Sequence, residues 1–307
     1  MPKPGESPVK RKVQAAVNNR RRVAVIGSGG QLGTDLVEAL QSHETFEVIP
    51  ITRAQADCTD AESVRKAVLQ LRPRIVVNCA AFVRVDECED QPQDAFAVNA
   101  LGALHIARAC AEADSMCVYV STDYVFDGSK AGPYSESDSA YPVNVYGASK
   151  LAGEILVRQT APHWLIVRAA SLFGRTGARG KGGNFVETVL TKAKMGEPLR
   201  IVNDVRMSPT YTRDAATALV GLVEAGADGI VHLTNDGACT WHEFAEQILD
   251  LVGLRVSIDP VSSKEYPTPA RRPKNSVLRS ERSLVKLRSW KDALRAYLIE
   301  KGYICAS

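Results

Sequence analysis

The stretch VIGSGGQLG at residues 25–33 decides the fold of this 307-residue chain. It follows a short apolar run and leads into an amphipathic stretch, which is the context of a turn between a strand and a helix. In such a turn Gly27 permits the tight bend, Gly30 lets the backbone approach a pyrophosphate, and Gly33 lets the helix pack closely on the strand. The helix N-terminus then faces the anion. The stretch predicts a dinucleotide-binding turn with GxxGxxG spacing; a glycine-rich turn that binds no nucleotide is the alternative.

Short apolar runs alternate with amphipathic stretches on both sides of this turn. Strands that are apolar throughout, each followed by an amphipathic helix, predict a parallel sheet covered on both faces, which is a doubly wound α/β fold of the Rossmann type. The predicted strands are residues 23–26, 48–51, 75–78 and 117–121, and the predicted helices are residues 31–41, 61–71, 94–113 and 144–159.

The alternation loosens after Arg168, where a Gly-rich stretch and a Pro-rich loop, residues 266–273, enter the sequence. Insertions of this kind usually build a lobe for the substrate. Further predicted elements are helices at residues 184–195, 210–224 and 240–254 and a strand at residues 229–233. We predict a disordered basic tail (1–21), a dinucleotide-binding domain (22–173, with a return of 209–235), and a smaller substrate lobe (174–208 and 236–307).

Composition excludes several classes of protein. The chain is 45% hydrophobic and 24% charged, as in ordinary soluble proteins. The net charge of +3 comes largely from the first 22 residues, so the body has no electrostatic footprint for nucleic acid. No run approaches the ~18 apolar residues of a membrane span. The seven cysteines are scattered without C-x-x-C spacing, and the N-terminus lacks the apolar core of a secretory signal, so we expect reduced thiols and a cytoplasmic protein.

The segment YGASK at residues 146–150 carries the expected chemistry. Tyr146 and Lys150 stand at i and i+4 near a helix start, so they share one face. A nearby lysine cation lowers the pKa of a phenol, which suits tyrosine to exchange a proton with a substrate oxygen. A hydroxyl at the end of the preceding strand, Ser121 or Thr122, would hold the carbonyl. A surface pair is the alternative, but the glycine turn, the hydroxyls and YxxxK in this order predict a short-chain dehydrogenase/reductase.

Cofactor choice is predicted from the end of the second strand, Thr52-Arg53. An NAD-selective protein usually has an acidic residue there to bind the ribose 2′-hydroxyl, and none is present. Arg53 could bind a 2′-phosphate instead, since guanidinium suits phosphate geometry. A solvated arginine is the alternative. We therefore expect NADPH, with NADH as a second reductant.

Several stretches together resemble the dTDP-4-dehydrorhamnose reductase family of extended short-chain reductases. They are GSGGQLG (27–33), NCAAFVRVDECE (78–89), STDYVFDG (121–128), NVYGASKLAGE (144–154), SPTY (208–211) and YPTPARRPKNSVL (266–278). The resemblance implies NADPH-dependent reduction of the C4 ketone of a dTDP-linked 4-dehydro-6-deoxy sugar, such as dTDP-4-dehydro-L-rhamnose to dTDP-L-rhamnose. Thr122 would bind the keto oxygen, Tyr146 would protonate it, and Lys150 would orient the cofactor.

The resemblance also implies a set of contacts. Around the cofactor these are Gly30, Gln31 and Leu32 at the pyrophosphate, in the turn that Gly27 and Gly33 shape, Asp57 and Cys58 at the adenine, Cys79, Ala80 and Ala81 at the ribose, and Asn99 as a support. Toward the substrate, Asp123 would contact the sugar. Arg84 departs from the resemblance, since many members have a small residue there; close to the expected cleft, it would bind the diphosphate or change which sugar is accepted. Asn184, Arg272 and Asn275 of the predicted lobe are candidate contacts to sugar, base or diphosphate. The alternatives are a turn cap for Asp123, a helix-surface amide for Asn99, and loop-ordering hydrogen bonds for the last three.

Competing functions remain at this point. Dehydratases of the wider class typically have Asp-Glu after the threonine, whereas Tyr124 occupies the glutamate position here, which favours reduction. A non-catalytic regulatory protein similar to the methionine adenosyltransferase beta subunit is the main alternative, and an epimerase with bound NAD is another. Some relatives bind magnesium at a dimer interface, but the sequence locates no ligands for it. The histidines show no shared metal-ligand spacing, and a homodimer is left open.

Overall fold

The computed structural model describes residues 20–177, 183–282 and 286–305. Residues 1–19 of the predicted basic tail lie outside the described residues, as do residues 178–182 of the Gly-rich stretch. Arg21 was assigned to the tail, but it opens the first strand and pairs with Phe46. The strand exceeds the apolar run because backbone pairing continues beyond the last buried side chain.

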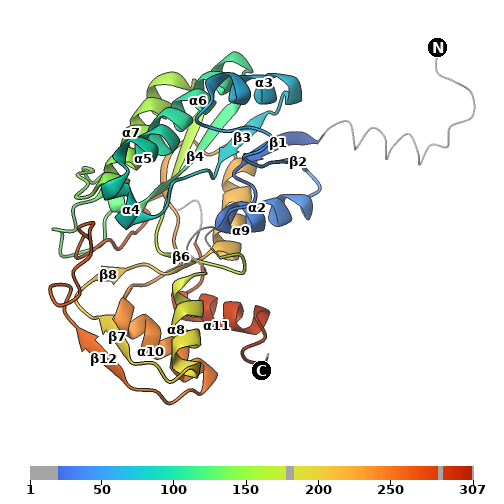
Figure 1. Ribbon diagram of the computed structural model, residues 1–307. Helices are drawn as coiled ribbons and strands as arrows, with labels where there is room; N and C mark the ends of the chain where they lie inside the picture. Colours follow the sequence, from blue (N-terminus) through green and yellow to red (C-terminus); the bar gives the residue numbers. More distant parts are fainter. Residues whose placement is uncertain (1–19, 178–182, 283–285, 306–307) are drawn as a thin grey trace, which may run out of the picture.

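A six-stranded sheet forms the upper part of the molecule in Figure 1, and all its neighbouring strands run parallel. The strand order is β10-β5-β4-β3-β1-β2, so the order reverses beside β1, where β2 and β3 lie on opposite sides of it. In open sheets of this kind ligands bind outside the carboxyl ends of the strands at such a point. The strands are β1 (Arg21–Ile26), β2 (Phe46–Ile51), β3 (Ile75–Asn78), β4 (Met116–Thr122), β5 (Trp164–Ala169) and β10 (Gly229–His232).

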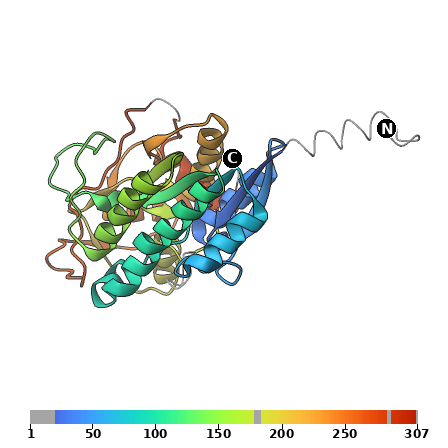
Figure 2. The same ribbon diagram turned by 90° about the horizontal axis from the view of Figure 1, so that it is seen from above.

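Helices cover both faces of the sheet (Figure 2), which confirms the doubly wound fold. Alternate side chains of one strand enter different cores: Val23 and Val25 belong to the first, Ala24 and Ile26 to the second. Strand side chains point alternately to opposite faces, so a strand covered on both faces must be apolar throughout. On the first face lie α2 (Gln31–Gln41) and α9 (Thr212–Glu224); on the second lie α3 (Ala61–Leu71), α6 (Gly102–Glu112) and α7 (Val145–Thr160).

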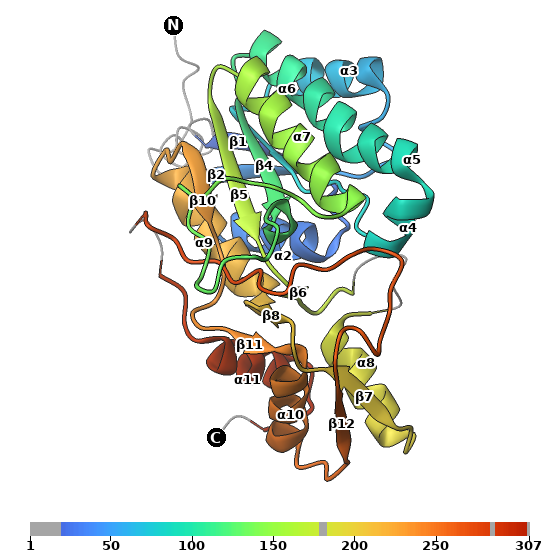
Figure 3. The same ribbon diagram turned by 90° about the vertical axis from the view of Figure 1, so that its left-hand side faces the viewer.

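A third core gathers residues that follow β5 in the chain, some before and some after β10, and it forms the lower part of Figures 1 and 3. The Phe173 ring packs there against Phe244 and Tyr297, and its centroid lies 5.5 Å from the centroid of each. This part corresponds to the predicted substrate lobe, whose exact bounds stay a prediction. Its elements are α8 (Phe185–Lys194), α10 (Trp241–Val252) and α11 (Trp290–Glu300), the parallel pair β7 (Leu199–Val202) and β12 (Ile258–Val261), and the antiparallel pair β8 (Arg206–Met207) and β11 (Cys239–Thr240).

Some elements differ from prediction. The helix predicted at residues 94–113 is α5 (Pro92–Phe96), a π-helical turn η1 (Ala97–Leu101) and then α6. The helix predicted from residue 210 begins at Thr212, because Thr210 and Tyr211 form β9, which pairs with β6 (Leu172–Phe173). Three helical elements had not been predicted: α4 (Val85–Asp90), the 3-10 turn η2 (Asp123–Val125) and α11.

Helix α10 is capped by Thr240. Thr240 accepts from the Glu243 backbone N–H, while the Glu243 carboxylate accepts from the Thr240 N–H, so the two residues form a complete capping box. No helix in the described part of the chain is long and apolar enough to cross a membrane.

Candidate active site

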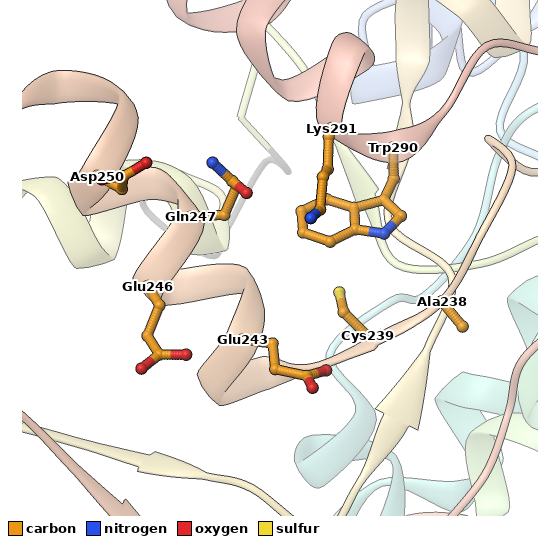
Figure 4. Close-up of a pocket in the computed structure, with 8 residues that line it drawn as sticks. All are labelled: Ala238, Cys239, Glu243, Glu246, Gln247, Asp250, Trp290 and Lys291. Atoms are coloured by element: carbon orange, nitrogen blue, oxygen red, sulfur yellow. The ribbon is translucent and has the colours of Figure 1, made fainter.

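A cleft of about 1750 Å³ opens between the carboxyl ends of the strands and the lower lobe. Its wall includes the start of α2, the end of β4, the first turn of α7 and a segment that we call the strap, residues 266–274. A smaller hollow of about 430 Å³ lies between α10 and the start of α11 (Figure 4), and none of the predicted site residues line it. The large cleft is therefore the candidate active site.

The backbone around the glycine turn is packed so tightly that Gly27 and Gly33 have no room for a side chain. Gly27 has φ +78°, and a Cβ on it would lie 2.7 Å from the Ala80 nitrogen. A Cβ on Gly33 would lie 2.3 Å from the Gly27 oxygen. Gly30 is the N-cap of α2 and makes no side-chain cap, so no capping side chain occupies the first backbone N–H groups of the helix.

This turn fits a dinucleotide. Gly30, Gln31 and Leu32 line the cleft, whereas Gly27 and Gly33 supply the close packing behind it. The Gln31 Nε2 donor is buried and has no hydrogen-bond partner among the described residues. A buried donor without a partner is costly, and a phosphate oxygen at the helix N-terminus would satisfy it.

The residues after β2 pair with one another. Arg53 Nε lies 3.0 Å from Asp57 Oδ2, with 82% of the arginine side chain exposed. Asp57 Oδ1 also accepts from the Thr59 N–H, which lowers the Asp57 pKa below its usual value. Burial raises the pKa of the adjacent Cys58 thiol. The predicted 2′-phosphate and adenine contacts thus form one small network outside the lining of the cleft.

The segment after β3 reaches the cleft. Cys79 and Ala81 line it, and Ala80 lies behind against Gly27. The Ala80 N–H donates to Asn78 Oδ1 at 3.0 Å, which fixes this turn. Burial raises the pKa of Cys79 to about 12, so its thiol is neutral at physiological pH.

Asn99 lies at the centre of the π-helical turn with its side chain fully buried, which rules out a helix-surface amide. Its Oδ1 accepts from the Phe82 N–H at 2.8 Å, and its Nδ2 donates to the Phe82 oxygen and to Ser149 Oγ. The Asn99 backbone carbonyl oxygen accepts from the Tyr119 hydroxyl at 2.8 Å. One residue of the widened turn thus joins three segments of the chain, and such turns often mark functional sites.

Ser121 and Thr122 at the end of β4 were both candidates to hold the substrate carbonyl, and their hydrogen bonds distinguish them. Ser121 also lines the cleft, but its Oγ donates its hydrogen to Glu154 Oε1 at 2.5 Å. Thr122 Oγ1 donates to Asp123 Oδ1 at 3.0 Å and makes a side-chain hydrogen bond with Tyr146. Since a hydroxyl has a single hydrogen, Thr122 donates either to Asp123 or to Tyr146, and its bond to Tyr146 lowers the pKa of the phenol because the phenol oxygen accepts it.

Tyr146 lies at the cleft floor and keeps part of its surface open. Burial raises its pKa, and the Thr122 hydrogen bond offsets this only in part. The direction is opposite to the lowering predicted from the i, i+4 spacing. The reason is that Lys150 does not face the phenol here: its Nζ donates to the Val120 oxygen at 2.7 Å and lies 4.0 Å from the Tyr119 ring centroid.

Lys150 itself is 1% exposed, and burial lowers its pKa to about 7. The charge of Glu154 acts in the opposite direction. Asp123 is 3% exposed, and burial raises its pKa to about 6 although Ser276 and Thr122 hydrogen-bond to it. The floor of the cleft therefore holds three titratable groups whose pKa values are displaced in the direction of the neutral form.

The family model described as RmlD substrate binding domain matches residues 21–302. The chain belongs to the dTDP-4-dehydrorhamnose reductase family. It is 35% identical to a dTDP-4-dehydrorhamnose reductase from Bacillus anthracis whose crystal structure is a complex with NADP, with a TM-score of 0.86 over 92% of this chain and 99% of that one. It is thus an oxidoreductase with the extended short-chain dehydrogenase/reductase fold.

Two curated relatives add detail. The chain is 40% identical over 288 residues to the spore coat polysaccharide biosynthesis protein SpsK of Bacillus subtilis, covering 92% of this chain and 99% of SpsK. It is 38% identical over 279 residues to a dTDP-4-keto-6-deoxy-D-glucose reductase of Streptomyces niveus, covering 89% of this chain and 95% of that protein.

Two of the predicted substrate contacts, Arg84 and Arg272, lie at the cleft, and each forms an ion pair with a carboxylate of the same chain. Arg84 forms an ion pair with Glu87 at 2.9 Å. Arg272 forms a two-armed ion pair with Asp86, one arm of which measures 2.7 Å from NH2 to Oδ2. Both arginines line the cleft, so they are within reach of a ligand, and Arg272 also joins the strap to α4.

The two asparagines have mainly structural contacts. Asn184 caps α8 and donates to the Gly174 oxygen at 2.9 Å and the Tyr297 hydroxyl at 3.1 Å. Asn275 donates to the oxygens of Lys130 and Gly132, both at 2.8 Å, and is not part of the cleft wall. This geometry favours the loop-ordering alternative, above all for Asn275.

Sequence reasoning missed the buried pair of Glu154 and Arg168 behind the site. Their side chains are 2% and 4% exposed and 2.7 Å apart. Spacing offered a signal, since Glu154 follows Lys150 by one helical turn. No group of three or more His, Cys, Asp or Glu residues in the described ranges is arranged to hold a metal ion, and magnesium gains no support.

Proposed function

We propose that the protein catalyses NADPH-dependent reduction of the C4 ketone of a dTDP-linked 4-dehydro-6-deoxy sugar, converting dTDP-4-dehydro-L-rhamnose to dTDP-L-rhamnose. The observation that carries the proposal is the hydrogen-bonded pair of Thr122 and Tyr146 at the floor of a cleft that begins at the glycine turn. That arrangement can hold a carbonyl oxygen and give it a proton beside a bound dinucleotide.

NADPH held at Gly30, Gln31 and Leu32 would supply the hydride for the carbonyl carbon. Tyr146 is the proton donor to the carbonyl oxygen, and its raised pKa keeps the phenol protonated and ready to donate. The C4 ketone thereby becomes a C4 hydroxyl with its C–O bond kept, and the Tyr146 phenolate is left to be reprotonated.

Thr122 holds the carbonyl oxygen in this proposal. Its hydrogen is directed at Asp123 in the structure, so donation to substrate requires rotation about the C–O bond of the threonine. Such a hydroxyl rotates freely among staggered positions. Asp123 then remains available, through its second carboxylate oxygen, for a sugar hydroxyl; that oxygen has no hydrogen-bond partner among the described residues.

The test is an absorbance assay of NADPH oxidation with purified protein and enzymatically prepared dTDP-4-dehydro-L-rhamnose, followed by NMR of the product at C4. The dTDP-4-keto-6-deoxy-D-glucose substrate serves as the second arm, because one relative is named for it. Binding of NADPH without oxidation by either sugar would favour a regulatory protein. NAD that co-purifies and stays bound through turnover would favour an epimerase.

Two coarser proposals accompany the reaction. The free cysteines in the described part of the chain suit a reducing compartment, so we place the protein in the cytoplasm. We retain a homodimer as the assembly to test by light scattering of the purified protein.

A further inference from the structure

We propose that Glu154 is a positioning residue for this reaction: bound to Arg168 and Ser121, it holds the turn of α7 that carries Lys150 and keeps a negative charge facing the lysine ammonium. The inference rests on the proposed function in one respect, the role of Lys150 at the cofactor. It concerns a residue behind the cleft that contacts neither reactant.

The geometry ties three elements together. Glu154 on α7 receives two bonds from Arg168 on β5, Nε to Oε1 at 2.9 Å and NH2 to Oε2 at 2.7 Å. It receives a third from Ser121 Oγ on β4 at 2.5 Å. All three residues are at most 5% exposed. Because Glu154 is one helical turn beyond Lys150, this anchor fixes the rotation of the helix face that presents the lysine.

The groups that face Lys150 come from four directions, and one of them carries a full negative charge. Cys58 before α3 and Cys79 after β3 are thiols whose pKa values burial raises, so they are neutral near pH 7. Strand β4 offers the Val120 oxygen and the face of the Tyr119 ring. From α7 itself comes the carboxylate of Glu154, whose charge is the largest of those acting on Lys150.

Within the described ranges, the surroundings of Arg168 offer it one anion. Arg168 lies 5.1 Å from the Phe126 ring centroid, and its neighbour His232 has a pKa lowered by burial, so that imidazole is neutral. Glu154 is the anion that pairs with it. Replacing a buried ion pair by uncharged groups of similar volume is often neutral or stabilising, so stability alone does not explain the pair. In this proposal the ion pair has a functional role, because it holds a negative charge one helical turn from Lys150.

The sign of the effect follows from the charge. A lysine facing a carboxylate keeps its proton to higher pH than one that does not. Activity and cofactor binding that depend on the ammonium fall as pH rises through the lysine pKa. Without Glu154 that fall moves to lower pH.

The test uses the double variant Glu154→Gln with Arg168→Met, which removes both charges and leaves no buried ion unpaired. We expect the alkaline midpoint of kcat/KM, and of NADPH affinity measured by fluorescence, to move down by about one pH unit or more. Ser121→Ala is the matched control: it loses a bond to Glu154 but keeps both charges, so its midpoint stays at the wild-type value. A wild-type midpoint in the double variant overturns the proposal.

A second variant keeps the proposal testable if the double variant does not fold. Glu154→Asp keeps the charge on a shorter arm, so we expect an unchanged midpoint with a lower kcat, as misplacement of Lys150 predicts. A midpoint that shifts in this variant as well would show that packing, not charge, is responsible, and would also overturn the proposal. NADPH affinity separates this outcome from failure of the proposed function: a wild-type protein that binds NADPH but reduces neither sugar refutes the function, while its binding profile still tests Glu154.

Discussion

Lys150 is a buried cation in the cleft, and its environment has a cost that can be measured. An ordinary lysine has a pKa of 10.5, whereas Lys150 has one of about 7 in the folded protein. Below pH 7 both the folded and the unfolded states carry the charge, and the folded state bears the full penalty of burying it. As pH rises from 7 to 10.5 the folded state loses its proton first, so the penalty disappears.

The first prediction is that Lys150→Met abolishes reduction but stabilises the fold. We expect a gain on the order of 2 to 4 kcal/mol in the free energy of unfolding at or below pH 7, declining to near zero at pH 10.5. Denaturant unfolding of wild type and variant across this pH range measures it. A gain that grows with pH would contradict the sign.

The second prediction concerns the phenol. Tyr146→Phe should lower turnover by a factor of about a hundred or more, as expected for loss of a general acid, while NADPH affinity stays within a few-fold. Tyr141→Phe is a matched control, because Tyr141 lines the same cleft but is 74% exposed. Steady-state kinetics and NADPH titration test both variants; near-wild-type turnover of Tyr146→Phe would remove the tyrosine from the mechanism.

The third prediction is for the cofactor phosphate. Because Thr52-Arg53 at the end of β2 contains no acidic residue, no carboxylate stands at the position that usually binds the ribose 2′-hydroxyl, and Arg53 can bond to a 2′-phosphate. Its exposure and its pairing with Asp57 reduce the gain, so we expect about a ten-fold preference for NADPH, equal to about 1.4 kcal/mol.

Two variants separate the contributions. Arg53→Ala should mostly erase the preference, and Asp57→Asn should increase it by releasing the guanidinium. Catalytic efficiency with NADPH and NADH at two salt concentrations decides the matter, and an NADH preference in the wild-type protein would refute the assignment.

At the scale of single elements, the first turn of α7 sets the position of Tyr146. Gly147 is pressed against the preceding 3-10 turn: a Cβ there would lie 2.1 Å from the Tyr124 oxygen. Any side chain must therefore move the start of α7 away from β4, taking Tyr146 with it.

The fourth prediction is that Gly147→Ala lowers kcat by about ten- to a hundred-fold, since a small displacement of a reacting group has effects of this size. The same change in α9, Gly221→Ala, is the control, because a Cβ there meets nothing within 4 Å. The control should gain about 0.5 to 1 kcal/mol of stability from the helix propensity of alanine. Thermal unfolding and kinetics are measured together, and unchanged kcat in Gly147→Ala would contradict the argument.

The elements also show what the sequence could predict. The sheet and its first helices followed from apolar runs and glycines, because their patterns are local. The widened turn at Asn99 could not be predicted, since it depends on bonds to Phe82 and Ser149, which are distant in the chain. Helix α11 was missed because its face packs on a core assembled from other segments.

The site was predictable in the same sense. Motif positions identified Thr122, Tyr146 and Lys150 as neighbours of one cleft. Sequence could not give the direction in which each side chain points. That is why Lys150 was predicted to face the phenol but bonds to Val120, and why Ser121 stayed an alternative until its bond to Glu154 was seen.

At the scale of the whole molecule, the ion pair of Arg272 and Asp86 closes one rim of the cleft. It connects the strap, which belongs to the last third of the chain, to α4 beside the sheet. The fifth prediction is that Arg272→Ala raises the KM for the sugar nucleotide by roughly ten-fold, the effect of losing one charge-assisted contact.

A double-mutant cycle tells how the arginine acts. If Arg272 works through Asp86, then Asp86→Ala should have the same effect and the double variant should be no worse than either. If Arg272 binds the diphosphate directly, its removal should cost more than removal of Asp86. An unchanged KM in Arg272→Ala would withdraw it from substrate binding altogether.

Strand β10 has a consequence for synthesis on the ribosome. Its partner β5 is finished at Ala169, but β10 begins only at Gly229, after much of the lower lobe has been made. During translation the apolar edge of β5 therefore waits without its neighbour, and unpaired edges of this kind recruit other chains. A nascent chain halted before residue 229 should be held by chaperones, while one that has passed His232 can bury that edge itself.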